Sequence, residues 1–224
     1  SDIAILALLS DPDDTPDPDP ETKAIVYLNM DEGSGKAAAD SSGNGHNGQL
    51  VGGATWASGK NGQGVQTDGN SGALKIPHNS AINLGNDDGD FTTAFWVNLQ
   101  EGANGNWRGL AKKGDAWDQR VFALYLLPDS NQLYVASTTS KSFNEGEVSN
   151  GSLGVGTWTH VTYVKRGRSI ELYLNGKRDS SFQLSAKAVP NTGAIYLGAA
   201  PEDSASTKAI YDDFKLFTKA LGAG

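Results

Sequence analysis

Short stretches in which apolar and polar residues alternate follow one another along the chain from residue 24 onward. They are rich in Val, Ile, Tyr, Phe, Trp and Thr, and polar turns such as PDSNQ and KRGRS separate them. A period of two places successive side chains on opposite faces of a strand, and no convincing amphipathic helix interrupts it. The sequence therefore predicts an all-β fold of short antiparallel strands, at residues 24–30, 73–78, 91–99, 120–127, 132–138, 158–165, 170–177, 194–200 and 209–217.

The first 22 residues differ in composition from the rest of the chain. DPDDTPDPDPET alternates acid and proline, which removes backbone donors and favours an extended, solvated tether. The apolar run before it is too short to span a membrane. We therefore divide the chain into an acidic Pro-rich linker or leader remnant, residues 1–22, and one β-sandwich domain, residues 23–224.

Charge and cysteine content exclude several classes of function. A net charge of −8 and a pI near 4.8 argue against a nucleic-acid binder, which needs clustered Lys and Arg. The chain contains no cysteine, so neither a disulfide framework nor a thiolate metal site can form. We expect no nucleic-acid partner and no insertion into a membrane.

Several motifs occur in an order that resembles a known family. The segments YLNMDEGSG, ADSSGNGHNGQL, DFTTAFWVN, GTWTHVTYV, IELYLNGK, AIYLGA and YDDFKLFTKAL are similar to the laminin-G-like branch of the concanavalin A-like lectin and glucanase superfamily. The resemblance extends over residues 24 to 221. It implies an antiparallel β-sandwich of two sheets, a jelly roll, like that of noncatalytic carbohydrate-binding modules.

The loop at residues 29–48 combines glycines with oxygen-bearing side chains. Its GNGHNG matches G-x-G-x-x-G, but the strand-like QLVGGATW follows it, where a dinucleotide site needs a helix. Hard cations such as calcium take carboxylate, amide and carbonyl oxygens, which such a loop can supply. A metal loop is therefore the better interpretation.

Alternation along residues 209–217 predicts that Asp212 shares a face with Phe214 and Leu216, where a carboxylate needs a partner. The resemblance implies a structural calcium ion that ties the opening loop to the last strand. The expected ligands are Asp31, Ser34, Asp40, Asn44 and Asp212. The alternative is that Asp40 merely caps a turn and Asp212 accepts hydrogen bonds from backbone amides.

No catalytic motif is evident. Sugar-cleaving enzymes of the resembled fold carry Glu-x-Asp-x-x-Glu on one strand, a motif that this sequence lacks. Glu145 and Glu147 are predicted to lie in a loop, since Asn-Gly pairs flank them. The three histidines lie in different segments, and His160 is expected to be packed and hydrogen-bonded. We expect that the domain is not an enzyme.

Two tryptophans indicate a binding site, because Trp107 and Trp117 lie in GNWRGLAKKGDAWDQRVF, a polar stretch predicted to connect strands. Aromatic rings stack on the CH faces of sugars, and charged or amide side chains bond their hydroxyls. The expected ligand-binding residues are Trp107, Arg108, Lys113, Trp117, Asp118, Gln119, Arg120 and Tyr125, with Tyr134 as a secondary candidate. The alternative is that the tryptophans close a small core under the loop.

We therefore expect a noncatalytic carbohydrate-binding module with a polysaccharide partner, and the cations in this stretch favour an anionic polymer. We expect a monomeric domain of a larger, secreted or cell-surface, multidomain protein, possessing one structural calcium ion. A protein-binding, adhesive laminin-G-like module is the alternative, and a polysaccharide hydrolase or lyase is the third hypothesis.

Overall fold

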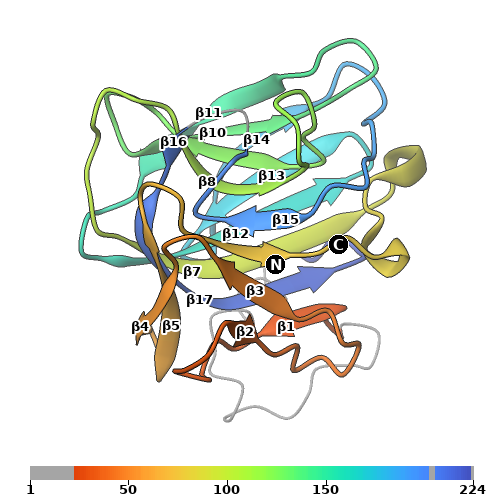
Figure 1. Cartoon of the computed structure of the whole chain (residues 1–224). Coiled ribbons are helices and arrows are strands. Elements are labelled where there is room, and N and C mark those ends of the chain that lie inside the picture. Colours follow the sequence, from red (N-terminus) through yellow and green to blue (C-terminus); the bar gives the residue numbers. More distant parts are fainter. Residues whose placement is uncertain (1–22, 202–204, 223–224) are drawn as a thin grey trace.

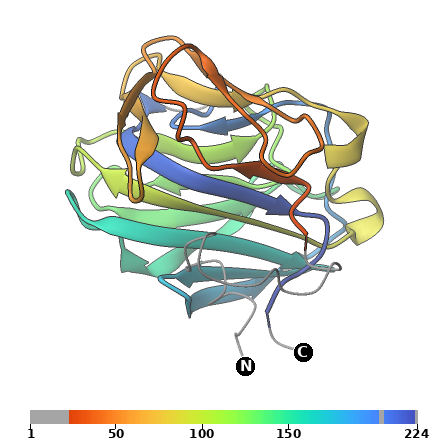
Figure 2. The same cartoon turned by 90° about the horizontal axis from the view of Figure 1, so that it is seen from below.

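Two sheets pack face to face in the computed structural model, which describes residues 23–201 and 205–222 (Figures 1 and 2). Almost every strand pair is antiparallel, so the predicted all-β sandwich is confirmed. The predicted linker at residues 1–22 lies outside the described residues. In the described part, the helices are two short 3-10 turns, η2 (Ser80–Ile82) and η3 (Asn86–Asp88), neither of which could span a membrane.

The first sheet has eight strands in the order β14-β13-β12-β7-β17-β5-β4, and β1 pairs with β17. Their bounds are β14 (Lys177–Gln183), β13 (Ser169–Leu174), β12 (Trp158–Arg166), β7 (Phe91–Leu99), β17 (Lys208–Phe217), β5 (Gln63–Asp68), β4 (Thr55–Ser58) and β1 (Val26–Leu28).

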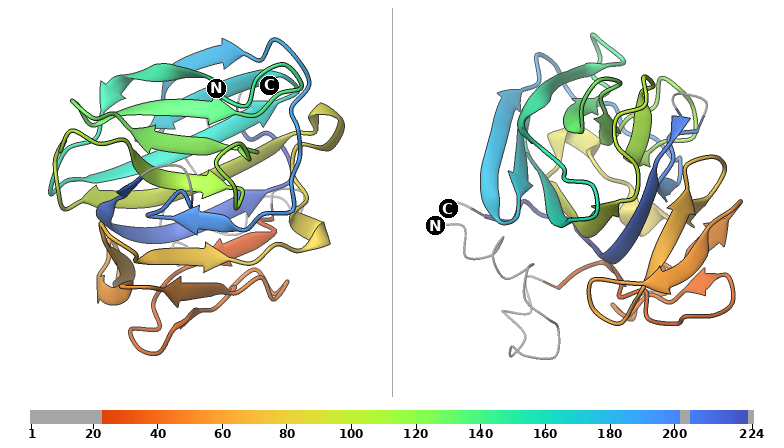
Figure 3. Two further views of the ribbon diagram at one scale, coloured as in Figure 1. Left: turned by 45° about the horizontal axis from the view of Figure 1, so that its top comes forward. Right: turned by 90° about the vertical axis from the view of Figure 1, so that its left-hand side faces the viewer.

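The second sheet has nine strands in the order β11-β10-β9-β8-β15-β6-β3-β2, and β16 pairs with β8 in parallel. Their bounds are β11 (Glu145–Ser152), β10 (Gln132–Ser137), β9 (Ala123–Leu126), β8 (Arg108–Lys113), β15 (Ile195–Leu197), β6 (Ala73–Ile76), β3 (Gly48–Val51), β2 (Ala37–Ala38) and β16 (Ala205–Ser206). Figure 3 shows the two sheets from two further sides.

The core lies between the sheets, as period-two alternation predicts. Phe91 of β7 stacks on Tyr163 of β12 with ring centroids 5.5 Å apart, and Phe122 approaches Tyr163 at 5.8 Å from the opposite sheet. The Tyr163 hydroxyl reaches across to the Ser137 hydroxyl at 2.9 Å. This buried polar contact joins the sheets, as does the Tyr211 hydroxyl, which donates to the Leu110 carbonyl at 3.0 Å.

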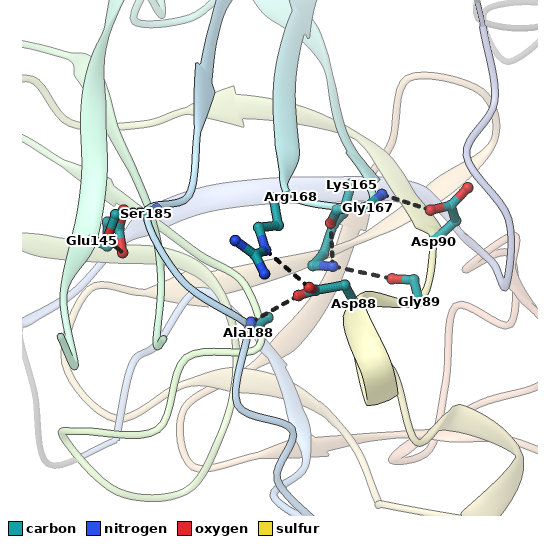
Figure 4. Close-up of polar contacts among 9 residues, drawn as sticks. All are labelled: Asp88, Gly89, Asp90, Glu145, Lys165, Gly167, Arg168, Ser185 and Ala188. Atoms are coloured by element: carbon teal, nitrogen blue, oxygen red, sulfur yellow. Dashed lines mark hydrogen bonds and ion pairs between the residues drawn. The ribbon is translucent and has the colours of Figure 1, made fainter. Parts of the chain in front are cut away.

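Polar contacts fasten one end of the sandwich (Figure 4). The Asp88 carboxylate accepts hydrogen bonds from Arg168 Nε at 3.1 Å and from the Ala188 amide at 3.0 Å. The neighbouring Asp90 accepts one from the Gly167 amide at 2.7 Å. These acids thus tie the turn between β12 and β13 to the segment before β7 and to residue 188.

Two segments predicted as connections are strands. Arg108–Lys113 forms β8, which is buried along its whole length in the middle of the nine-stranded sheet. Glu145 and Glu147, predicted in a loop, lie on β11 at the edge of that sheet. The strand β8 shows no simple alternation of apolar residues because it contains a bulge, and β11, EGEVSNGS, is a mostly polar strand at the edge of the sheet.

Candidate functional site

Three large aromatic side chains remain exposed along the outer face of the nine-stranded sheet. Trp107 is 45% exposed, Trp117 51% and Phe143 47%. Trp107 directly precedes β8, Trp117 follows it, and Phe143 lies between β10 and β11. Exposed aromatic groups of this size commonly mark a contact surface.

The first pair of rings consists of Trp107 and Tyr134. Their centroids lie 5.8 Å apart and their planes meet at 74°, an edge-to-face contact. Tyr134 stands opposite Tyr125 in the β9–β10 ladder, and both face away from the core because Leu124 and Leu133 point into it. Trp107 is therefore fixed by a ring that the sheet itself positions.

The second pair consists of Trp117 and Phe143. Their centroids lie 5.0 Å apart, with the planes at 75°. The ring of Phe143 also lies 5.2 Å from the guanidinium carbon of Arg120. Each exposed tryptophan is thus held edge to face by a second ring, which leaves a large part of the indole in contact with solvent.

Arg120 connects the two pairs. It is buried, donates from Nε to the Tyr125 hydroxyl at 2.9 Å, and donates from Nη1 to the Phe143 carbonyl at 2.9 Å. The Tyr134 hydroxyl donates to the Asn144 carbonyl at 3.3 Å. Rings and guanidinium thus form one connected cluster, which we call the aromatic arc; it consists of Trp107, Tyr134, Tyr125, Arg120, Phe143 and Trp117.

The loop that carries Trp117 is fixed by hydrogen bonds. Gln119 Oε1 accepts from the Asp115 amide at 3.1 Å, and Lys112 Nζ donates to the Ala116 carbonyl at 2.8 Å. The Asp115 carboxylate in turn accepts from the Tyr196 hydroxyl at 2.9 Å. Gln119, predicted as a sugar ligand, therefore serves to shape this loop.

Two further predicted ligands are buried, in contrast to the exposed loop position expected from the sequence. Arg108 donates to the Gly102 carbonyl at 2.9 Å and to Asn131 Oδ1 at 3.1 Å. Lys113 donates to the Gly193 carbonyl at 2.7 Å, and burial lowers its pKa to about 8. Both cations are used to hold backbone in place, because they occupy the two ends of the buried strand β8.

The remaining predicted ligand residues lie on or beside the arc. Asp118 is exposed, and its carbonyl accepts a hydrogen bond from Thr138 at 2.8 Å. Tyr125 is buried beneath Arg120. Phe143 was missed, although it gives the same signal as the tryptophans, a large aromatic side chain in the polar turn SKSFNEG.

The residues expected to bind calcium fall into two places. Asp40 caps backbone: it accepts from the amides of Tyr27, Ser42 and His46 at 2.9 to 3.0 Å. These bonds lower the pKa of Asp40 although burial opposes them. Asn44 donates to the Ile25 carbonyl. Asp40 and Asn44 therefore fasten the opening loop to the start of β1. Ser34 is exposed and does not take part in these hydrogen bonds.

Asp31 and Asp212 both contact a different segment, the turn at residues 60–63. Asp212 Oδ2 accepts from the amides of Lys60 and Asn61 at 2.7 and 3.0 Å, and Asp31 Oδ1 accepts from the Gln63 amide at 2.8 Å. Burial raises the pKa of Asp212 to about 7, and the negative charges of Asp213 and, to a smaller extent, Asp31 contribute in the same direction. The turn thus brings together two carboxylates from distant parts of the chain.

The predicted orientation of Asp212 is wrong. Asp212 pairs with Trp96, on the outer face of the eight-stranded sheet, whereas Tyr211 and Phe214 both point into the core. The strand changes parity between them at a bulge, where Asp213 adopts a φ of 56°. Alternation counted through the bulge therefore assigned Asp212 to the wrong face.

The side chains considered for catalysis have structural partners. His160 is buried beside Thr162, and burial lowers its pKa to about 3. Although burial opposes the effect, hydrogen bonds from Ser185 and Thr139 lower the pKa of Glu145. Among the described residues, no three His, Cys, Asp or Glu side chains gather as a metal cluster.

Several solved structures share the fold. The binding domain of Paraclostridial Mosquitocidal Protein 1 matches with a TM-score of 0.72 and 16% identity, over 89% of this chain and 50% of that one. The receptor binding domain of botulinum neurotoxin C/D mosaic serotype matches with a TM-score of 0.70 and 13% identity, over 89% and 49%. The chain thus spans about half the length of these two domains.

A third structure is similar over nearly its whole length. Domain 4 of AbnA, a GH43 extracellular arabinanase from Geobacillus stearothermophilus solved with arabinotriose, has a TM-score of 0.66 and 17% identity, over 90% of this chain and 95% of that domain. At these identities the likeness establishes the fold alone. A search of curated proteins found no match.

A family model matches residues 68–224, more than half of the chain, and confirms the resemblance that the sequence motifs indicate. The chain belongs to the laminin-G-like family of the concanavalin A-like lectin/glucanases superfamily.

Proposed function

We propose that this domain is a noncatalytic carbohydrate-binding module and that the aromatic arc binds the polysaccharide. One observation carries the proposal: the two tryptophans, each about half exposed, are each held by another ring on the same face of one sheet. Sugar rings present CH faces that pack on such indoles. Sites with fixed aromatic side chains bind with little loss of conformational entropy.

Stacking is proposed as the main source of affinity. The sequence analysis favoured an anionic polymer because of cations such as Arg108 and Lys113. Both side chains donate hydrogen bonds to main-chain carbonyls of the domain itself. Arg120 is buried below the rings, where it holds Tyr125 and the Phe143 carbonyl. Neutral polysaccharides are therefore the first class to test, with uronic and sulfated polymers for comparison.

A protein partner is the second candidate, and Val148 favours it. This side chain is 43% exposed and lies opposite Tyr134 on β11, so it extends the apolar surface beyond the rings. Extended apolar surfaces suit protein contacts better than hydroxyl-rich sugars. Two of the similar solved structures are described as a binding domain and a receptor binding domain.

We propose a structural calcium ion between Asp31 and Asp212. Each carboxylate uses one oxygen to accept amides of the turn at residues 60–63, and no described residue donates a hydrogen bond to the other oxygen. Two such oxygens beside a turn of mostly exposed residues suit a hard cation. Asp40 does not fit this set, because both of its carboxylate oxygens accept backbone amides, and Asn44 lies beside it, where its side-chain amide donates to the Ile25 carbonyl.

Affinity electrophoresis tests the proposal. The purified domain would be run through gels that contain neutral, uronic or sulfated polysaccharides, with calcium and with a chelator, and each sample would be assayed for new reducing ends. The proposal predicts retardation by at least one polymer without product. Absence of retardation in every gel would favour the protein partner, and product formation would establish an enzyme.

A further inference from the structure

We infer that the two aromatic pairs are separate subsites for one extended glycan, so that the domain recognises several consecutive sugar units. The inference rests on the proposed function and specifies its ligand. It would fail if each pair worked alone, even if the domain bound polysaccharide.

The two tryptophans lie beyond opposite ends of the strand β8. Trp107 lies one residue before β8, and Trp117 lies four residues after its end at Lys113. The six residues of β8 extend roughly 17 Å at about 3.3 Å per residue. That span exceeds the size of a single sugar ring several times over. We therefore expect that contact with both tryptophans needs a chain of several sugar units.

Side-chain contacts connect the two pairs. Tyr134 touches Trp107 with its ring, and its hydroxyl reaches the Asn144 carbonyl next to Phe143. Arg120 fills the space beside Phe143 and beneath it. Both pairs therefore belong to one face of the nine-stranded sheet, and we infer that a single chain lies along it.

Both ends of this face are fixed before any ligand arrives. Arg108 ties the loop before Trp107 to the β9–β10 turn through Gly102 and Asn131. Gln119 and Asp115 shape the loop that carries Trp117. A fixed separation favours a ligand whose contacts match it, because the second contact then forms at high effective concentration.

The experiment measures affinity as a function of ligand length. Linear oligosaccharides from the disaccharide upward, prepared from arabinan, β-glucan and pectin, would be titrated into wild type, Trp107→Ala and Trp117→Ala by calorimetry. Trp158→Ala serves as the control, since Trp158 lies on the outer face of the other sheet. Melting temperatures would verify that each variant is folded, as expected for side chains that are about half exposed.

The inference predicts a step in affinity at the length that spans both pairs, of about tenfold or more, or ~1.4 kcal/mol. Each single variant should remove this step and bind long chains no better than short ones. A smooth dependence on length, or a loss confined to one tryptophan, would overturn the inference and leave the proposed function intact. Failure of wild type to bind any oligosaccharide or its parent polymer would overturn both.

Discussion

The indole of Trp117 packs edge to face against Phe143, 26 residues further along the chain, with ring centroids 5.0 Å apart. The Phe143 carbonyl accepts a hydrogen bond from Arg120, which also bonds Tyr125. The position of one exposed tryptophan therefore depends on the turn that carries Phe143 and on the buried cation of Arg120.

Replacing Phe143 should weaken polysaccharide binding without unfolding the domain. Phe143→Leu removes the ring that orients Trp117, and such ring contacts contribute about 0.5–1.5 kcal/mol, so affinity should fall several-fold. Phe143→Tyr keeps the ring and should bind like wild type. Equal affinities for Phe143→Leu and wild type in affinity gels would show that Trp117 needs no such support.

Arg120→Lys should lower stability more than Arg168→Lys does. Lysine cannot reproduce the two bonds to Tyr125 and Phe143, and each buried bond to a charged group contributes about 1.5–3 kcal/mol. The Arg168–Asp88 pair is exposed on the arginine side, so its replacement should cost less than about 1 kcal/mol. Chemical denaturation measures both, and the reverse order would contradict the role assigned to Arg120.

Calcium should raise the melting temperature of wild type relative to chelator, and Asp31→Asn and Asp212→Asn should abolish the shift. Asp40→Asn provides the contrast. Because Asp40 caps three backbone amides, its replacement should lower the melting temperature equally with and without calcium. A calcium-dependent shift that survives Asp212→Asn would place the ion elsewhere.

His160 should make the fold sensitive to acid. Its pKa is about 3 in the folded state, below the usual 6.5, because burial disfavours the charged ring. Above pH 6.5 the ring is neutral in both states and has no effect. As the pH falls below this value the unfolded state takes up the proton first, which lowers the free energy of unfolding by about 2 kcal/mol at pH 5.

His160→Gln should flatten this part of the pH profile. Denaturant unfolding of both proteins between pH 7 and pH 4 measures the difference. If wild type and His160→Gln lose stability in parallel, other groups cause the acid sensitivity.

Much of the fold could be predicted from the sequence because alternation reports directly on which face of a strand is buried. The strand β12 follows this rule: Val161 and Tyr163 face the core, and His160 lies on the outer face of the sheet. The rule fails at bulges. Leu110 and Ala111 both enter the core, and the parity of β17 changes at Asp213. No pattern in a single sequence marks such an insertion.

The sequence predicted the exposed tryptophans of the candidate site but not which of the neighbouring polar residues are buried. Trp107 and Trp117 could be found because large aromatic side chains in polar segments are unusual. Arg108 and Lys113 are cations in the same polar stretch, so the sequence alone cannot distinguish them from exposed ligands. In the structure they lie at the ends of a buried strand, where they donate hydrogen bonds to carbonyls of other loops. Such partners depend on the tertiary fold, as does the contact between Phe143 and Trp117.

The most direct test of the central claim is to follow the indole N–H resonances of the five tryptophans by NMR while a retained polysaccharide fragment is added. Single Trp→Phe variants assign the signals. The account predicts that Trp107 and Trp117 shift with a common affinity, while Trp56 and Trp158 stay in place. Shifts confined to Trp96 or Trp158, on the other sheet, would contradict the aromatic arc as the binding site.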